Sequence, residues 1–194
     1  MHRSNPRPAS PASVVPRDDS LLVERALGGD SDAYEELYRR HRDGVARMGY
    51  LLLGDADQAQ DAAQEAFLIG WRELRSLREP DRFRAWVTGI AVNACRRRRR
   101  AAARAWGAAA SESQAPDAAS DEGDAAVLRV AVGRAVDALP PRMREAVVLR
   151  FYCGFAEAEI AQTLGIAAGT VKSRLGRART RLAVALRAVV EVDE

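Results

Sequence analysis

The sequence contains very few of the residues that bind metals or form disulfides. Its 194 residues include only two cysteines and two histidines. Cys95 and Cys153 lie far apart in the chain, and neither belongs to a CxxC motif or a Cys/His cluster. This pattern predicts no metal site and no disulfide framework, because both require cysteines or histidines at short, regular spacing. Each cysteine is predicted to be a small buried residue.

Long apolar runs are also absent. No stretch of eighteen apolar residues occurs, and the N-terminal segment lacks the apolar centre of a secretory signal peptide. We therefore expect the protein to stay in the cytoplasm, where cysteines remain reduced. Residues 1–17 are rich in proline and serine, which predicts a disordered tail.

The motifs of common enzyme classes are missing as well. The sequence has no GxxxxGK phosphate-binding loop, no HExxH zinc motif and no serine nucleophile elbow. Neither histidine has a carboxylate in a recognisable catalytic setting. We therefore predict no catalytic residue and no cofactor, and expect that the protein is not an enzyme.

What the sequence does contain is arginine, concentrated in two places. The net charge is only +3 and the isoelectric point is about 9.2, and Lys172 is the only lysine. One cluster is the run of five arginines at residues 96–100, and the other is GTVKSRLGRARTRL at residues 169–182, which has five cations and no acid. Such blocks repel themselves when solvated alone, so a polyanion is their expected partner.

Apolar residues in the first half recur every three or four positions, which predicts α-helices. We expect one helix over residues 31–53, with a capping box formed by Asp32 and Glu35 and a stop at Gly54. A second helix is expected over about residues 55–77 and a third over about residues 83–100. The proline-containing segment REPDR between the last two predicts a short loop.

The second of these helices is predicted to have two distinct faces. Its apolar positions form a core side, whereas acidic and amide side chains gather on another face by the same spacing of three and four. That acidic face consists of Asp57, Asp61, Gln64 and Glu65. The large aromatic residues here lie on the apolar stripes and are predicted to be core residues: Trp71, Phe83 and Trp86.

The composition divides the chain into two helical bodies. Helical patterning extends over residues 18–100 and again over residues 126–190, and residues 101–125 are rich in alanine, serine and acids, which predicts a flexible linker. In the second body we expect Pro141 in the first turn of a helix and Thr170 as the N-cap of the last helix. The predicted fold is all-α, with two small helical domains joined by a flexible linker.

The end of the second body fits a helix-turn-helix, with a turn at Gly165. On the last helix Val171, Leu175, Ala178 and Leu182 are predicted to form an inward stripe, so that the cations lie outside it and face DNA. Small or polar donors early in the helix suit base edges, and later cations suit phosphates. The predicted DNA-binding residues are Thr170, Lys172, Ser173, Arg174, Arg177, Arg179 and Arg181.

Four longer stretches together are similar to one protein family. They are LVERALGGDSDAYEELYRRH, DAAQEAFLIGWREL, FRAWVTGIAVNACRRRR and LPPRMREAVVLRFYCGFAEAEIAQTLGIAAGTVKSRLGRARTRL, in this order. They resemble the extracytoplasmic-function (ECF) group of bacterial sigma factors, within the sigma-70 superfamily, over about residues 18–187. Four motifs in the right order are much more specific than a helix-turn-helix alone.

This resemblance implies how the two bodies function. Residues 18–100 resemble the domain that melts the promoter, and its minus-10 contacts are implied at Arg84, Asn93, Arg96 and Arg97. The helix containing DAAQEAF resembles the one that docks on the clamp helices of the polymerase largest subunit. Candidates for binding core polymerase are therefore Asp61, Gln64, Glu65 and Phe67.

Residues 126–190 resemble the domain that reads the minus-35 element. The residues that match family positions meeting this duplex are Lys172, Ser173, Arg174 and Arg177. The implied partners are promoter DNA, the clamp helices and flap region of core RNA polymerase, and an anti-sigma factor. Ala156 departs from the family by standing where a capping hydroxyl is common, which predicts a less firmly capped helix.

A free-standing transcriptional regulator that binds DNA without joining polymerase is the alternative at this point. A helix-turn-helix over residues 155–182 fits that alternative equally well. It gives no role to the first body, in which the arginine block accompanies an acidic helix.

Overall fold

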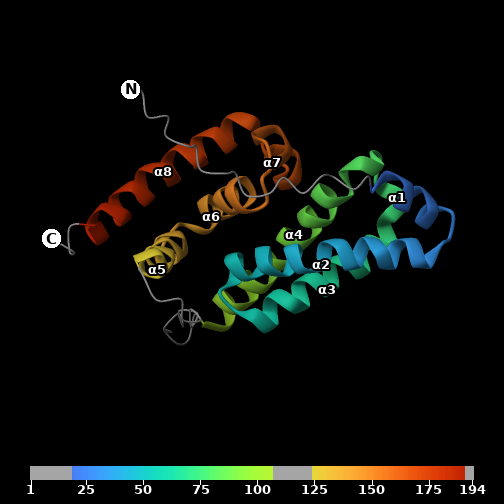
Figure 1. Ribbon diagram of the computed structural model, residues 1–194, viewed down its shortest axis with the longest axis horizontal. Coiled ribbons are helices and arrows are strands. Elements are labelled where there is room, and N and C mark those ends of the chain that lie inside the picture. The colour runs from blue at the N-terminus through green and yellow to red at the C-terminus, as the bar shows by residue number, and fades with distance from the viewer. Residues whose placement is uncertain (1–18, 107–123, 191–194) are drawn as a thin grey trace, which may run out of the picture.

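The computed structural model describes residues 19–106 and 124–190. Within these ranges every regular element is a helix (Figure 1). The all-α fold class predicted from the sequence is therefore confirmed. The predicted tail lies outside the described residues, and so does most of the predicted linker, residues 107–123. None of the described helices is long and apolar enough to cross a membrane.

The first half forms a helical unit in which α2 and α3 pack along each other and α4 packs against both (Figure 1). Leu37, Met48 and Phe83 are among its fully buried side chains. The elements are α1 (Ser20–Leu27), α2 (Ser31–Leu53), α3 (Ala56–Glu73), α4 (Phe83–Trp106) and two short 3₁₀ turns, η1 (Leu74–Ser76) and η2 (Pro80–Arg82).

The start of α2 differs from the prediction, whereas its end agrees. The N-cap is Asp30, whose Oδ1 accepts hydrogen bonds from the backbone N–H groups of Asp32 at 3.0 Å and Ala33 at 3.1 Å. The predicted capping box at Asp32 is therefore wrong, because a carboxylate two residues earlier already caps the helix. Gly54 ends α2 with a φ of 73°, a left-handed conformation that favours glycine.

The aromatic predictions are confirmed for Phe83 and wrong for Trp71. Phe83 is completely buried and Trp86 is partly buried against the same core. Trp71 is 43% exposed, because the buried row of α3 runs through Phe67 and Gly70 and leaves Trp71 at its edge. From that edge its ring covers Tyr34, with the ring centroids 4.9 Å apart.

Tyr34 and Gly70 are in tight contact, and this contact leads to a prediction about stability. The buried Tyr34 hydroxyl donates a 2.6 Å hydrogen bond to the Phe67 carbonyl, and a Cβ at Gly70 would lie 2.7 Å from this hydroxyl oxygen. We expect Tyr34→Phe to lower the free energy of unfolding by about 1 kcal/mol. Gly70→Ala should cost about 1–3 kcal/mol through overpacking.

The double variant distinguishes a specific clash from general damage. Removing the hydroxyl makes room for the new methyl group, so Tyr34→Phe/Gly70→Ala should be clearly less destabilised than the sum of the single variants. Urea denaturation of the three variants measures this coupling. If the losses of the two single variants simply add in the double variant, the Tyr34 hydroxyl is not the group that requires glycine at position 70.

The second half forms another helical unit, made of α5 (Asp124–Asp137), α6 (Pro141–Val147), the π-helical turn η3 (Val148–Tyr152), α7 (Glu157–Leu164) and α8 (Ala168–Val190). Pro141 is the first residue of α6, as predicted. Gly165 ends α7 with a φ of 63° and makes the turn toward α8. Thr170 is not the N-cap of α8, because the helix has already begun and the Thr170 N–H bonds to the Ala167 carbonyl.

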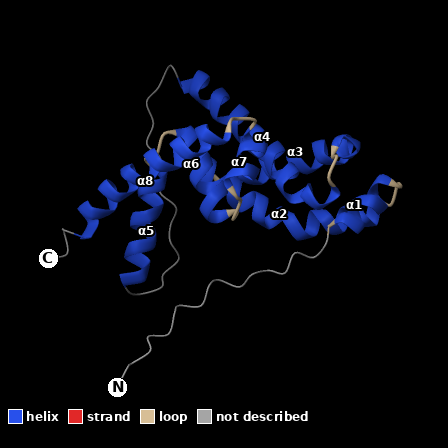
Figure 2. Cartoon of the chain, turned by 90° about the horizontal axis from the view of Figure 1, so that it is seen from above, coloured by secondary structure: helices blue, strands red, loops and turns tan. Residues whose placement is uncertain are grey.

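The two units also pack against each other. α4 contacts α7, while α2 contacts α6 and η3, and the buried side chains of both units belong to one hydrophobic cluster. In Figures 1 and 2, α4 lies on the side of the first unit that faces the second, and α5 and α8 extend away from it. Two of the minus-10 candidates on α4, Arg84 and Arg96, bond to residues of the second unit.

Candidate nucleic-acid interface

The exposed face of α8 carries a dense group of hydrogen-bond donors. Val171, Leu175 and Ala178 are buried and Leu182 is partly buried, so the predicted inward stripe is confirmed. The rest of the helix surface exposes four cations and two hydroxyls: Lys172, Ser173, Arg177, Arg179, Thr180 and Arg181. A Cβ at Gly176, within this face, would contact nothing within 4 Å, so another molecule has room to approach the helix backbone there.

Arg174 does not lie outside the stripe as predicted. It is only 8% exposed, because it follows Val171 by three positions and precedes Ala178 by four, which places it at the edge of the buried side. Burial lowers the pKa of its guanidinium, an effect that the charge of Glu145 opposes. Its Nη1 atom has no hydrogen-bond partner within the described residues.

The first helix of the helix-turn-helix is capped better than its sequence predicts. Ala156 is the N-cap residue and has no side chain that can accept a hydrogen bond. The Glu159 carboxylate instead accepts a 2.6 Å hydrogen bond from the Ala156 N–H. This is half of a capping box, and it places a negative charge at the positive end of the helix dipole.

The minus-10 candidates lie along α4 and differ in their surroundings. Asn93 is exposed, and its Oδ1 accepts a 3.3 Å hydrogen bond from Nη1 of Arg96. Arg84 donates to the Cys153 carbonyl at 2.5 Å, and Arg96 forms an ion pair with Glu145 at 2.7 Å, so both engage the second unit. Arg97 is exposed and pairs within the first unit.

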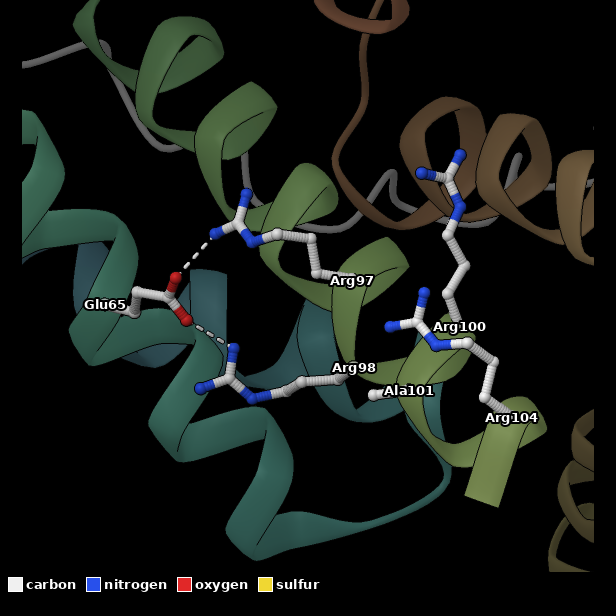
Figure 3. A pocket seen from close by; sticks show the side chains of 6 residues that line it. All are labelled: Glu65, Arg97, Arg98, Arg100, Ala101 and Arg104. Atoms are coloured by element: carbon white, nitrogen blue, oxygen red, sulfur yellow. Dashed lines mark hydrogen bonds and ion pairs between the residues drawn. The ribbon is translucent and has the colours of Figure 1, made fainter. Parts of the chain in front are cut away.

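Arg97 and Arg98 reach the Glu65 carboxylate from α4, each at 2.5 Å (Figure 3). These hydrogen bonds, the one from Arg98 first, hold the pKa of Glu65 below its usual value. Arg100 and Arg104 line the same hollow, whose volume is about 420 Å³. The arginine block is therefore partly neutralised by carboxylates of the chain itself.

The polymerase-binding candidates do not all lie on the surface. Asp61 and Gln64 are exposed on α3, and the Glu65 side chain is 36% exposed. Phe67 is only 3% exposed, and its ring packs edge-on against Tyr38 at 5.0 Å between centroids. As a core residue, Phe67 positions α3 and does not present a surface contact.

Both cysteines are buried, as the sequence predicts. Cys95 and Cys153 are both buried and free, and burial raises the pKa of each thiol to about 11. Each thiol therefore stays protonated at neutral pH and is a poor nucleophile.

Comparison with known proteins assigns a family to both units. The pattern of Sigma-70 region 2 matches residues 37–105, and that of Sigma-70, region 4 matches residues 129–182. The ECF RNA polymerase sigma factor SigM of Mycobacterium tuberculosis is 38% identical over 167 residues, covering 86% of this chain and 84% of SigM. The chain belongs to the ECF sigma factors.

Other relatives of this sigma factor agree. The RNA polymerase sigma-H factor of Pseudomonas aeruginosa is 31% identical, covering 89% of this chain and 96% of that protein. The ECF sigma-E factor of Escherichia coli K12 is 33% identical, with coverages of 83% and 90%. The solved structure of CnrH in complex with the cytosolic domain of CnrY is 29% identical, with a TM-score of 0.66 over 88% of this chain and 98% of CnrH.

Sequence reasoning missed two apolar residues on the sigma factor's α3. Leu68 is 54% exposed and Trp71 is 43% exposed. Leu68 follows Asp61 by seven positions and Gln64 by four, so these side chains share one side of the helix. The sequence does contain a signal for Leu68, because its position falls outside the apolar spacing that predicts the core side of this helix.

Proposed function

We propose that this ECF sigma factor binds core RNA polymerase in the cytoplasm, directs it to promoters with two separate elements, and assists strand opening. Bond formation in RNA remains with the polymerase. The observation that supports this most strongly is that each sigma-70 match coincides with a helical unit bearing its own arginine-rich surface.

α8 is the proposed reader of the minus-35 duplex. Lys172 and Ser173 lie in its first turns, where exposed donors can approach base edges. Arg177, Arg179 and Arg181 are exposed further along the helix and suit phosphate contacts, which fix register and orientation. Thr170 is partly exposed at the start of the same helix.

Removing one phosphate contact should change how promoter binding depends on salt. We expect Arg177→Ala to weaken binding of the polymerase complex to promoter duplex and to reduce the slope of log K against log salt by about 0.9, because one fewer counterion is released. Fluorescence anisotropy over a salt series measures the slope. Arg39→Ala, which removes an exposed arginine of α2, is the matched control and should leave it unchanged. An unaltered slope in Arg177→Ala would mean that Arg177 does not touch DNA.

α4 is the proposed surface for the minus-10 element. Asn93 offers an amide that can both donate to and accept from a base, while Arg84, Arg96 and Arg97 offer charge for the phosphates of a separated strand. Holding one strand in the separated state favours opening, because the enzyme complex binds that state more tightly than the closed duplex.

The exposed side of α3 is the proposed contact with the polymerase clamp helices. Asp61, Gln64 and Glu65 give it a negative and polar character that complements a basic partner and steers association. Leu68 and Trp71 add apolar area beside these groups, and such area supplies affinity once the surfaces meet.

We also propose that an anti-sigma factor regulates this protein, as the family resemblance implies. The related CnrH has been solved with a second protein bound. A partner of that kind would cover the polymerase-binding or DNA-binding surfaces proposed above.

Association with polymerase distinguishes this proposal from a free-standing regulator. Size-exclusion chromatography of the full chain with purified core enzyme should give one co-eluting complex, and specific promoter binding should require that complex. A protein that binds its DNA site specifically alone and elutes apart from core enzyme would be the regulator instead.

A further inference from the structure

We infer that the hollow between α3 and α4 binds an oligophosphate, a chain of two or more phosphate groups that is free or carried by a nucleoside. Its volume of about 420 Å³ lies within the range of small-molecule pockets. The inference goes beyond the proposed function, which gives no role to two of the arginines in this hollow. The residues that line it are Glu65 of α3 and Arg97, Arg98, Arg100, Ala101 and Arg104 of α4 (Figure 3).

Helical spacing brings the arginines of the hollow together. Arg97, Arg100 and Arg104 follow one another by three and four positions, so they lie on one side of α4. Ala101 lies among them, and its small side chain leaves room between the longer ones. Like charges at this spacing repel each other on a helix, and an anion bound between them offsets that cost. The site therefore favours a ligand with several negative charges.

Glu65 shows that part of the hollow already binds an oxyanion. Its two carboxylate oxygens accept hydrogen bonds of 2.5 Å, one from Nη2 of Arg97 and one from Nη1 of Arg98. A phosphate group accepts charge-assisted hydrogen bonds from guanidinium groups in the same way as a carboxylate. The chemistry of these arginines is thus suited to phosphate oxygens.

Arg100 and Arg104 form the half of the hollow that no carboxylate occupies. Both side chains are exposed, and neither has a hydrogen-bond or ion-pair partner within residues 19–106 and 124–190. One phosphate can bind to this pair, and the next phosphate of the same chain extends toward Arg97 and Arg98, which line the same space (Figure 3). A chain of phosphates therefore fits the hollow better than orthophosphate.

Isothermal titration calorimetry of the full chain with inorganic triphosphate, in magnesium-free buffer at physiological salt, tests this site. We expect one ligand per chain, and Arg100→Gln/Arg104→Gln should weaken its binding roughly tenfold or more, because charge-assisted hydrogen bonds are lost. Orthophosphate should bind the wild type more weakly by a similar factor. The matched control, Arg75→Gln/Arg78→Gln, removes two exposed arginines outside the hollow and should leave the affinity unchanged.

Ala101 allows the hollow to be filled without any change of charge. Ala101→Leu places a larger side chain among the arginines, and leucine is nearly as good a helix former as alanine. We expect this variant to lose triphosphate binding by roughly tenfold, because the ligand and the new side chain need the same space. Ala103→Leu, an exposed alanine of α4 that does not line the hollow, should bind as the wild type does.

Adenosine triphosphate in the same titration distinguishes the two sources of the ligand. Equal affinities for adenosine triphosphate and inorganic triphosphate would assign the site to the phosphate chain alone, and tighter binding of the nucleotide would add contacts to the nucleoside. Triphosphate binding that is absent in the wild type, or that Ala101→Leu leaves intact, would overturn the inference and leave the sigma-factor assignment untouched. An equal loss in Arg75→Gln/Arg78→Gln would also overturn it, since the arginines would then act only through overall charge.

Discussion

Replacing Asp61 with arginine is expected to weaken binding of the sigma factor to core polymerase by roughly a hundredfold. Asp61 is exposed on the polar side of α3, and reversing its charge places two positive groups opposite each other if the clamp surface is basic. Juxtaposed like charges cost several kcal/mol, and a loss of about 3 kcal/mol corresponds to a hundredfold change in Kd. Surface plasmon resonance with immobilised core enzyme measures this change.

The matched control is Asp43→Arg. Asp43 lies on α2, its side chain is 74% exposed, and the substitution changes the net charge by the same amount. Its affinity for core enzyme should stay within about twofold of the wild type, because Asp43 is outside the proposed docking helix and the charge of an exposed side chain is screened by salt. If Asp43→Arg weakens binding as much as Asp61→Arg, the effect comes from overall charge and α3 is not the docking surface.

Phe83→Ala is expected to cause the largest loss of stability among single changes in the first unit. The ring is completely buried at the start of α4 and contacts Tyr34, His41 and Trp86, with centroids 5.7–6.1 Å away. Truncating a buried phenylalanine costs about 3–5 kcal/mol, because apolar contacts are lost and a cavity remains. Thermal and urea unfolding, followed by circular dichroism, measure the loss.

Leu21→Ala is the control for this prediction. Leu21 is 64% exposed on α1, so its truncation should change the free energy of unfolding by less than about 0.5 kcal/mol. A Phe83→Ala variant as stable as Leu21→Ala would show that α4 does not enter the core through Phe83.

Features decided by local chemistry were predictable from the sequence. Gly54 and Gly165 end their helices in left-handed conformations, and Pro141 begins a helix, because these residues restrict or permit particular backbone angles regardless of distant partners. The inward stripe of α8 followed from spacing alone.

The errors occurred at the edges of these patterns. Trp71 lies beside the buried row of α3, and Arg174 lies on the buried edge of α8, so a small rotation of the helix decides the exposure of each. The caps were misplaced for a related reason, since Asp30 and Asp32 are both acceptable N-caps and only the path of the chain selects between them.

The sequence predicts which residues make up the candidate site, but it does not predict which carboxylates pair with the arginines. Arginines on α4 were recognisable from the sequence, but Arg96 pairs with a carboxylate 49 positions away, and no local signal indicates that partner. From the sequence alone, Glu145 is expected to be an exposed acid of an amphipathic helix, because carboxylates are rarely buried. Its burial depends on how the two units meet.

Transcription in vitro tests the central claim most directly. Purified core polymerase is incubated with genomic DNA from the source organism, with and without the full-length sigma factor, and the 5′ ends of the RNA are sequenced. The account predicts that the protein concentrates initiation at a small set of sites that share two upstream sequence elements. Start sites as scattered with the protein as with core enzyme alone would contradict it.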